Sequence, residues 1–169
     1  MKKLILVCGA NGIGKSTACK RLIEILPSSA YIDSDYCRYM SPFSFSTGEM
    51  AVVVSIISNM MINYFSLSTI NNVIFQYGFH GLRRQTFNRI LALLDENGIK
   101  YKFCPILLEC SLEENMRRMQ NDNRDSERIN RAIVNTRNIY DEFCYPTIDV
   151  TQLSPEETAS KMKKIIEDY

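Results

Sequence analysis

The residues best suited to chemistry form a glycine-rich run near the start of the chain. Gly9-Ala10-Asn11-Gly12-Ile13-Gly14-Lys15-Ser16 matches the pattern G-x-x-x-x-G-K-S/T in full. Its glycines allow successive backbone N–H groups to point at an anion, and the start of the following helix adds free N–H groups. Lys15 can reach the β- and γ-phosphates of a nucleoside triphosphate, Ser16 can ligate Mg²⁺ and Thr17 can touch the α-phosphate. We therefore predict a site for ATP and Mg²⁺.

A pair of carboxylates follows the second apolar run, in Tyr31-Ile32-Asp33-Ser34-Asp35. Spaced i, i+2 at the end of a strand, the two side chains can point into one cleft. In phosphoryl transfer, Asp33 would hold a water of the Mg²⁺ shell, and Asp35 would orient or deprotonate an acceptor hydroxyl. The alternative is that both carboxylates only cap the next turn.

Arginine is concentrated in one later segment that contains no lysine. Guanidinium forks suit phosphate oxygens, so this segment is a candidate for binding the transferring group. The alternative is a solvated helix face whose arginines pair with nearby acidic residues. The six arginines are Arg117, Arg118, Arg124, Arg128, Arg131 and Arg137.

Four other side chains are candidates for contact with an acceptor. His80 is the only histidine and follows the third apolar run, where it contacts the acceptor or is simply structural. Arg38, Arg83 and Arg84 can bind an anionic acceptor, with solvation at the surface as the alternative.

Five short apolar runs, separated by segments of helical period, must position these residues. The predicted strands are 4–7, 30–32, 73–75, 103–108 and 147–150, and the predicted helices are 15–26, 46–67 and 82–94, with two more starting after Ser111 and Ser154. Segment 46–67 is apolar enough to be largely buried. This alternation predicts a single three-layer α/β domain over residues 1–169, with a five-stranded parallel sheet and helices on both faces.

Ligands of such sheets bind at the carboxyl ends of the strands. The segments to expect at that edge are 9–16, 33–35, 76–81, 109–111 and 151–154. Residues 151–153 are expected beside the adenine. The residues predicted to bind the nucleotide are Gly9, Asn11, Gly12, Ile13, Gly14, Lys15, Ser16, Thr17 and Thr151.

Composition narrows the class of protein. Of 169 residues, 46% are hydrophobic and 23% charged, which excludes intrinsic disorder. The net charge of +1 provides no general attraction to nucleic acid or anionic lipid, so a nucleic-acid partner is not expected. No apolar run approaches the roughly 18 residues that span a bilayer. Six cysteines without CxxC spacing indicate reduced thiols in a cytoplasmic protein, which we expect to be a monomer or a weak homodimer.

Two other classes of nucleotide-binding protein have partial signals. A GTPase needs an Asn-Lys-x-Asp guanine reader, which is missing, although Asp95-Glu96-Asn97-Gly98 fits D-x-x-G. Residues 90–96 also fit the apolar run and Asp-Glu pair of a motor ATPase. However, Phe87, Ile90, Leu91 and Leu94 follow a helical period, so we predict the end of a helix there instead.

The order of these motifs resembles the small P-loop kinases. Residues 9–17, then Tyr31-Ile32-Asp33-Ser34-Asp35, then Ile148-Asp149-Val150-Thr151 are similar to the nucleotide-kinase, shikimate-kinase-like and gluconate-kinase-like group of P-loop NTPases. The resemblance implies a central phosphate-loop strand, ATP with Mg²⁺ as donor, and acceptor contacts from Asp33 and Asp35. The chain departs from the shikimate-kinase pattern, which has three glycines where this chain has 76–81.

The resemblance also implies a mobile lid after the fourth strand, here around residues 117–131. Arg118 and Arg124 are the predicted lid arginines that neutralise charge on the moving phosphoryl group. The predicted function is an ATP-dependent phosphotransferase acting on a small hydroxyl- or phosphate-bearing acceptor, such as a nucleotide or sugar acid. The alternatives are an ATP-binding switch or slow ATPase and, less favoured by the charge, a kinase of nucleic-acid ends.

Overall fold

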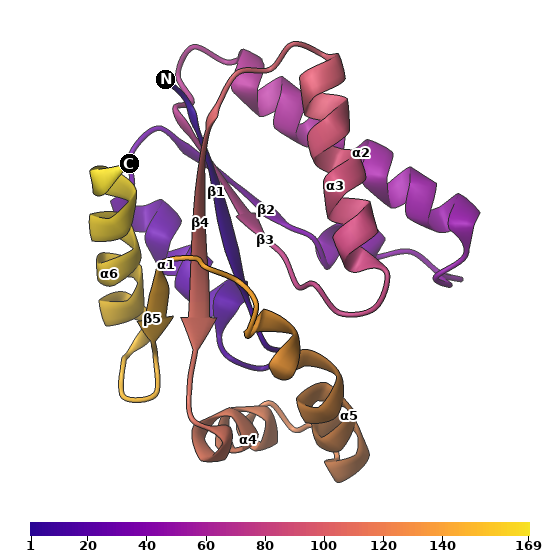
Figure 1. Ribbon diagram of the computed structural model, residues 1–169, viewed down its shortest axis with the longest axis vertical. Helices are drawn as coiled ribbons and strands as arrows, with labels where there is room; N and C mark the ends of the chain where they lie inside the picture. The colour runs from indigo at the N-terminus through magenta and orange to yellow at the C-terminus, as the bar shows by residue number, and fades with distance from the viewer.

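Five strands form one parallel sheet in the order β2-β3-β1-β4-β5 (Figure 1). The computed structural model describes all 169 residues. The strands are β1 (Lys3–Gly9), β2 (Ser29–Asp33), β3 (Asn72–Gln76), β4 (Lys102–Glu109) and β5 (Thr147–Asp149). Because β1 pairs with both β3 and β4, the strand that leads into the glycine-rich loop is central. The predicted α/β class and five-stranded parallel sheet are confirmed.

Six helices pack around the sheet, and four of them begin with a side-chain cap. They are α1 (Lys15–Ile25), α2 (Thr47–Ser66), α3 (Arg83–Glu96), α4 (Leu112–Asn121), α5 (Ser126–Thr136) and α6 (Pro155–Asp168). The Ser111 hydroxyl accepts from the backbone N–H of Glu114, which caps α4. Ser154 and Glu157 form the predicted reciprocal capping box of α6. These helices therefore begin where a local side chain accepts from one of their free N–H groups, whereas α1 and α3 have no such cap.

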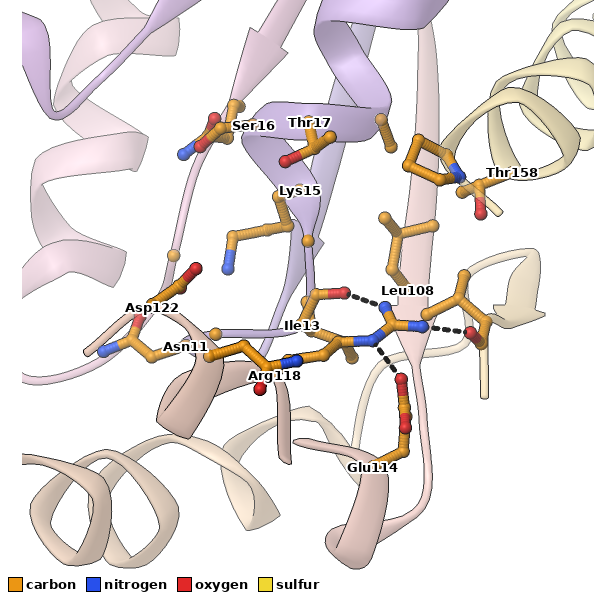
Figure 2. A pocket seen from close by; sticks show the side chains of 18 of the residues that line it. Asn11, Ile13, Lys15, Ser16, Thr17, Leu108, Glu114, Arg118, Asp122 and Thr158 are labelled. Atoms are coloured by element: carbon orange, nitrogen blue, oxygen red, sulfur yellow. Dashed lines mark hydrogen bonds and ion pairs between the residues drawn. The ribbon is translucent and has the colours of Figure 1, made fainter. Parts of the chain in front are cut away.

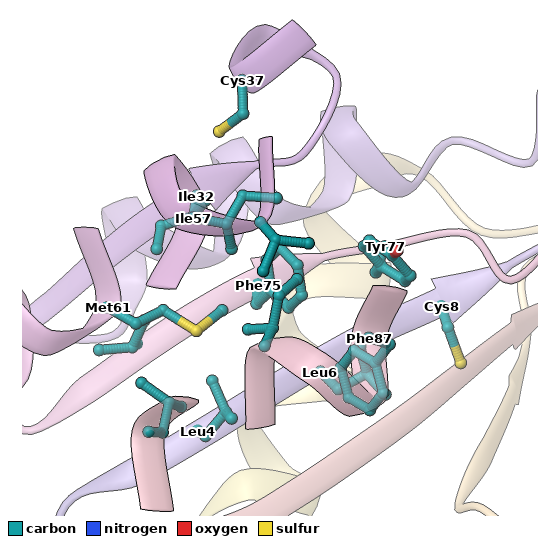
Figure 3. Close-up of a cluster of buried hydrophobic side chains, with 14 of the residues drawn as sticks. Leu4, Leu6, Cys8, Ile32, Cys37, Ile57, Met61, Phe75, Tyr77 and Phe87 are labelled. Atoms are coloured by element: carbon teal, nitrogen blue, oxygen red, sulfur yellow. The ribbon is translucent and has the colours of Figure 1, made fainter. Parts of the chain in front are cut away.

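The side chains of β1 alternate between two hydrophobic cores. Leu4 and Leu6 belong to the core on the side of α2 and α3, where Phe75 and Phe87 also pack (Figure 3). Ile5 and Val7 belong to the core on the side of α1 and α6. This alternation follows from the period of two in a strand, and it gives the central strand no exposed face.

Pro105 lies inside β4, an unusual place for a residue without a backbone N–H. Residues two apart on a strand point their backbone nitrogens to the same edge, so the Pro105 nitrogen faces the same edge as that of Leu107. The Leu107 N–H donates to the Pro146 carbonyl, on the β5 side of the strand. The pairing of β4 with β5 begins only at Leu107, so no ladder bond is lost at Pro105.

Helix α2 is less buried than its composition predicts. Only a third of its most apolar 18-residue stretch is buried, and Val52 and Ile56 lie exposed on its outer face. By length and composition alone it could cross a membrane, contrary to the expectation that no segment reaches that limit. Its other face, including Ile57 and Met61, packs in the core. The expectation of a largely buried helix is wrong because only one side of α2 meets the sheet.

The Asp95-Glu96 pair ends α3 rather than a strand, as the helical period predicts. Gly98, with φ +70°, follows and turns the chain towards the start of β4. The pair therefore lies at the amino edge of the sheet, opposite the glycine-rich loop. This placement removes the motor-ATPase interpretation of residues 90–96.

Candidate functional site

A cleft of about 1120 Å³ opens at the carboxyl edge of the sheet. Its walls come from the glycine-rich loop, the ends of β2 and β3, the turn after β5, and helices α4 and α5, which lie below the strand ends (Figure 1). Four of the five segments expected at this edge line the cleft, and Glu109–Ser111 does not. Most lining side chains are polar, as a site for a charged ligand requires.

The glycine-rich loop needs glycine at two tightly packed positions. Gly9 has φ +144°, and a Cβ there would lie 2.4 Å from the Leu108 carbonyl oxygen of β4. Gly12 has φ +78°, and a Cβ there would lie 2.2 Å from Cγ of Met119 on α4. A side chain at either position is therefore excluded, both by the backbone conformation and by the lack of space. The loop therefore packs closely against β4 and α4, and the rest of its surface lines the cleft.

Lys15 projects from the start of α1 with its ammonium inside the loop. Its Nζ donates to the carbonyl oxygens of Gly9 at 2.8 Å and Ala10 at 2.7 Å, so its partners are neutral. Burial lowers the pKa of Lys15 to about 8. A phosphate beside Lys15 would supply the anionic partner that the ammonium lacks.

Two helices hold the loop at Asn11, a contact that sequence reasoning missed. The Asn115 side chain of α4 donates to the Asn11 carbonyl at 3.0 Å, and the Asn11 N–H donates to the Thr136 hydroxyl of α5 at 3.0 Å. Arg137 in turn donates to the Asn115 amide oxygen at 3.2 Å. Nothing in the local sequence of Asn115 or Thr136 signals this role, because their partner lies more than a hundred residues away.

Arg118 makes a three-way connection at the base of the loop (Figure 2). Its guanidinium donates to the Ile13 carbonyl at 2.7 Å, the Val150 carbonyl at 2.6 Å and Glu114 at 2.7 Å. Hydrogen bonds from Arg117 and Arg118 lower the pKa of Glu114 to about 2. Arg118 therefore joins the phosphate loop, α4 and the turn after β5.

The Arg118→Gln protein is expected to be about 2 kcal/mol less stable than the wild type. Glutamine cannot span three acceptors, so carbonyls at Ile13 and Val150 lose a charged donor. Chemical denaturation followed by circular dichroism measures the change. Arg117→Gln is the matched control, because Arg117 pairs with the same Glu114 at an exposed position and its loss should destabilise the protein much less than the loss of Arg118. Equal losses in the two variants would contradict the connecting role of Arg118.

Arg124, the second predicted lid arginine, lines the cleft near the start of α5 and pairs with Asp122 at 3.1 Å. Arg128 also lines the cleft. A side pocket of about 240 Å³ is lined by Arg128 and Arg131 together with Asn11 and His80. Both arginines belong to the arginine-rich segment, although the sequence predicts only Arg118 and Arg124 as lid arginines. The segment predicted as a lid thus presents five guanidinium groups to the cleft or its side pocket, those of Arg117, Arg118, Arg124, Arg128 and Arg131.

The two aspartates after β2 have different environments. Asp33 accepts from the Asp35 N–H at 2.9 Å and from the Tyr31 hydroxyl at 3.2 Å, and it does not line the cleft. Asp35 lines the cleft, with 62% of its side chain exposed. Its carboxylate contacts Arg38 and lies 3.8 Å from Arg83. Asp35 is therefore the carboxylate that a ligand in the cleft can reach.

Among the residues predicted to bind the nucleotide or the metal, together with Asp35, Arg118 and Arg124, all except Gly9 and Asp33 line the cleft. Gly9 is the last residue of β1, at the start of the loop, and it packs against β4. The oxygen donors fit a Mg²⁺ ion held by the Ser16 hydroxyl, nucleotide phosphates and water, because Mg²⁺ keeps much of its hydration shell in such sites. No group of three or more acidic, histidine or cysteine side chains is placed to hold a metal without the nucleotide.

Of the three arginines considered for an anionic acceptor, Arg38 and Arg83 line the cleft and Arg84 does not. Arg84 pairs with Glu142 at 2.6 Å, away from the cleft. The Arg83 guanidinium is buried, donates to the Ser34 hydroxyl at 2.8 Å and lies 4.5 Å from the centre of the Tyr77 ring. The site is thus divided into a loop end around Lys15 and an arginine end around Arg83.

His80 lies beside Arg83 and is expected to titrate near pH 4, far below an ordinary histidine. Burial is the main cause of its lowered pKa of about 4, followed by the positive charges of Arg83 and Arg38. A ¹H NMR titration of the single histidine Hε1 signal measures the midpoint. Below about pH 6.5 the unfolded chain takes up this proton first, so stability is lost as pH falls towards 4. That loss should be smaller in His80→Gln, and a midpoint near 6.5 would contradict the buried environment.

Comparisons with known proteins agree with this architecture. No protein-family model and no curated protein sequence matches the chain. Among solved structures, a tunicamycin resistance protein from Deinococcus radiodurans aligns with a TM-score of 0.67 and 15% identity, over 98% of this chain and 96% of that chain. An APS kinase from Mycobacterium tuberculosis, in complex with AMPPNP and APS, aligns with a TM-score of 0.65 and 16% identity, over 98% of both chains.

A gluconokinase from Sinorhizobium meliloti 1021 also aligns, with a TM-score of 0.64 and 14% identity, over 98% of this chain and 94% of that chain. The likenesses extend over nearly the whole of each chain. At such low identity they establish the fold alone. The chain has the fold of the small P-loop kinases.

Proposed function

We propose that this chain, folded as a small P-loop kinase, transfers the γ-phosphoryl group of ATP to a hydroxyl or phosphate oxygen of a small molecule. The observation that carries the proposal is one cleft holding a buried ammonium, Lys15, in a glycine-rich loop at one end and an accessible carboxylate, Asp35, at the other. The kinases among the structural neighbours support this assignment, and one of them is bound to AMPPNP and APS.

The donor half of the cleft would bind ATP through the loop. Backbone N–H groups of the loop and the start of α1 receive the phosphates, and Lys15 exchanges its two carbonyl partners for phosphate oxygens. Ser16 would hold Mg²⁺, which neutralises phosphate charge when bound. Asp33, one turn away from the cleft, would act through water. The turn at Thr151 and the α4 face around Arg118 would enclose the adenine.

The acceptor half would position the attacking oxygen. For a hydroxyl acceptor, its oxygen bonds to the γ-phosphorus, the bond from that phosphorus to the bridging oxygen of ADP breaks, and Asp35 takes the hydroxyl proton. Arg124 and Arg128, facing the cleft from the lid segment, would neutralise charge on the moving phosphoryl group. Most of the rate would come from positioning and charge stabilisation.

Two measurements test the proposal. Isothermal titration calorimetry should detect binding of a non-hydrolysable ATP analogue in the presence of Mg²⁺. ADP release from ATP should then rise in the presence of at least one member of a panel of nucleosides, nucleotides, sugars and sugar acids. Absence of Mg²⁺-dependent nucleotide binding would overturn the donor site. Nucleotide binding without stimulation by any acceptor would favour an ATP-binding switch or slow ATPase.

A further inference from the structure

We propose that the acceptor carries an oxyanion, which binds Arg83 and Arg38 in place of the carboxylate of Asp35. The naming of this ligand as the acceptor rests on the proposed function, whereas the anion site itself rests only on the residues around Arg83. The shared chemistry is that of a carboxylate, sulfate or phosphate group.

The first argument is the incomplete charge pairing of Arg83. This residue is only 7% exposed, yet its nearest carboxylate oxygen, on Asp35, is 3.8 Å away. The same oxygen already contacts Arg38, so two guanidinium groups share one exposed carboxylate. Burying a cation without a close counter-ion is unfavourable. Burial and the charge of Arg38 accordingly lower the pKa of Arg83.

The second argument is that the Arg83 fork is held in place before any ligand binds. The Ser34 hydroxyl accepts from Nη2 at 2.8 Å, and the face of Tyr77 lies against the guanidinium at 4.5 Å. The Tyr77 hydroxyl also donates to the Arg83 carbonyl at 2.9 Å, which fixes the start of α3. A planar fork fixed in this way suits two oxygens of one oxyanion.

The third argument comes from His80, which borders the same end of the cleft. Its Nε2 lies 3.4 Å from Nη1 of Arg83, which can only donate, so the neutral ring carries its proton on Nδ1. Nδ1 is buried and has no hydrogen-bond partner. Because Nε2 faces Arg83 as a neutral acceptor, His80 supplies no negative charge to the guanidinium, which leaves that role to an oxyanion.

The arrangement links acceptor binding to activation of Asp35. Without the acceptor, Asp35 is paired with Arg38 and close to Arg83. An oxyanion that takes these arginines frees the carboxylate to accept a proton from the hydroxyl of the same molecule. An acceptor that lacks the anionic group leaves Asp35 paired, and it is therefore discriminated against in transfer as well as in binding.

The test uses the Hε1 NMR signal of His80, because no other histidine contributes to the spectrum. Sodium sulfate is titrated into the full-length protein without nucleotide, at constant ionic strength. We expect a saturable shift of this signal in the wild type and in Arg84→Gln, the matched variant outside the cleft. Arg83→Gln and Arg83→Lys should bind sulfate at least roughly tenfold more weakly, because each loses the fork.

Asp35→Asn should bind sulfate roughly thirtyfold more tightly, the effect of removing one negative charge about 4 Å from a dianion in water. Sulfate can also enter the phosphate loop, so the titration is repeated in Lys15→Ala, where the shift should persist. Acetate and inorganic phosphate titrations distinguish a carboxylate site from a tetrahedral one. A shift that survives Arg83→Gln, disappears with Lys15→Ala, or weakens in Asp35→Asn would overturn the proposal.

The outcome is separable from that of the proposed function. Sulfate binding at Arg83 without any ATP turnover would leave the anion site standing and remove the kinase assignment. Acceptor-stimulated ATP turnover without sulfate binding at Arg83 would keep the kinase and remove the oxyanion. If Arg83→Gln fails to fold, Arg83→Lys decides, because it keeps the charge near Tyr77 while losing the planar fork.

Discussion

The Lys15→Ala protein is expected to lose roughly 10³-fold or more in the rate of phosphoryl transfer. Lys15 provides the charge within the phosphate loop, and its present partners are carbonyl oxygens that a phosphate can replace. Alanine leaves the loop amides in place but removes the cation that stabilises charge on the γ-phosphate and on the departing ADP. The measurement is acceptor-dependent ADP formation, with the affinity for an ATP analogue determined by calorimetry.

The control for this variant is Lys20→Ala, which removes an exposed lysine from the same helix. Its transfer rate should stay close to that of the wild type. Circular dichroism should show that both variants remain folded, since Lys15 is replaced without changing the glycines that shape the loop. Transfer by Lys15→Ala at the wild-type rate would remove the phosphate loop from the mechanism.

Features that depend on neighbouring residues could be predicted from the sequence. The capping box at Ser154 and Glu157 depends on residues three apart, and the structure forms it as predicted. The same holds for the strand, glycine turn and helix around Lys15. Because parallel strands end at one edge, these local predictions were sufficient to bring Lys15 and Asp35 into one cleft.

Features that depend on distant partners could not be predicted in this way. Arg118 was selected as a lid residue because of its charge, but its carbonyl partners belong to segments 105 and 32 residues away. The i, i+2 spacing predicts that Asp33 and Asp35 both point into the cleft. The turn after β2 separates them, because Asp33 accepts the backbone N–H of Asp35 and so directs the second carboxylate into the cleft.

Helix α2 illustrates a third limit. Its composition and period predict a helix correctly, but they do not reveal how much of its surface another element covers. Ile57 faces the sheet and is fully buried, whereas Ile56, one residue earlier, is exposed. How much of a helix is covered depends on which other elements pack against it. The sequence of the helix alone does not show that no element covers its outer face.

The Asp35→Asn protein is expected to lose about 10²- to 10⁴-fold in transfer to a hydroxyl acceptor while keeping its affinity for the ATP analogue. Asparagine keeps the size of the side chain but cannot accept the hydroxyl proton. The donor half of the cleft does not depend on Asp35, since the loop is held by Asn115, Thr136 and Arg118. Steady-state kinetics with ATP and the stimulating acceptor, together with calorimetry, measure the two quantities separately.

Asp33→Asn is the matched comparison, because it changes a carboxylate two residues away that does not line the cleft. Asp33 affects the reaction only through the Asp35 N–H and through water, so its loss should be smaller than that of Asp35→Asn. Wild-type transfer by Asp35→Asn would exclude Asp35 as the proton acceptor. A larger loss in Asp33→Asn would assign the main carboxylate role to Asp33, and the turn after β2 would then have to reverse in the complex.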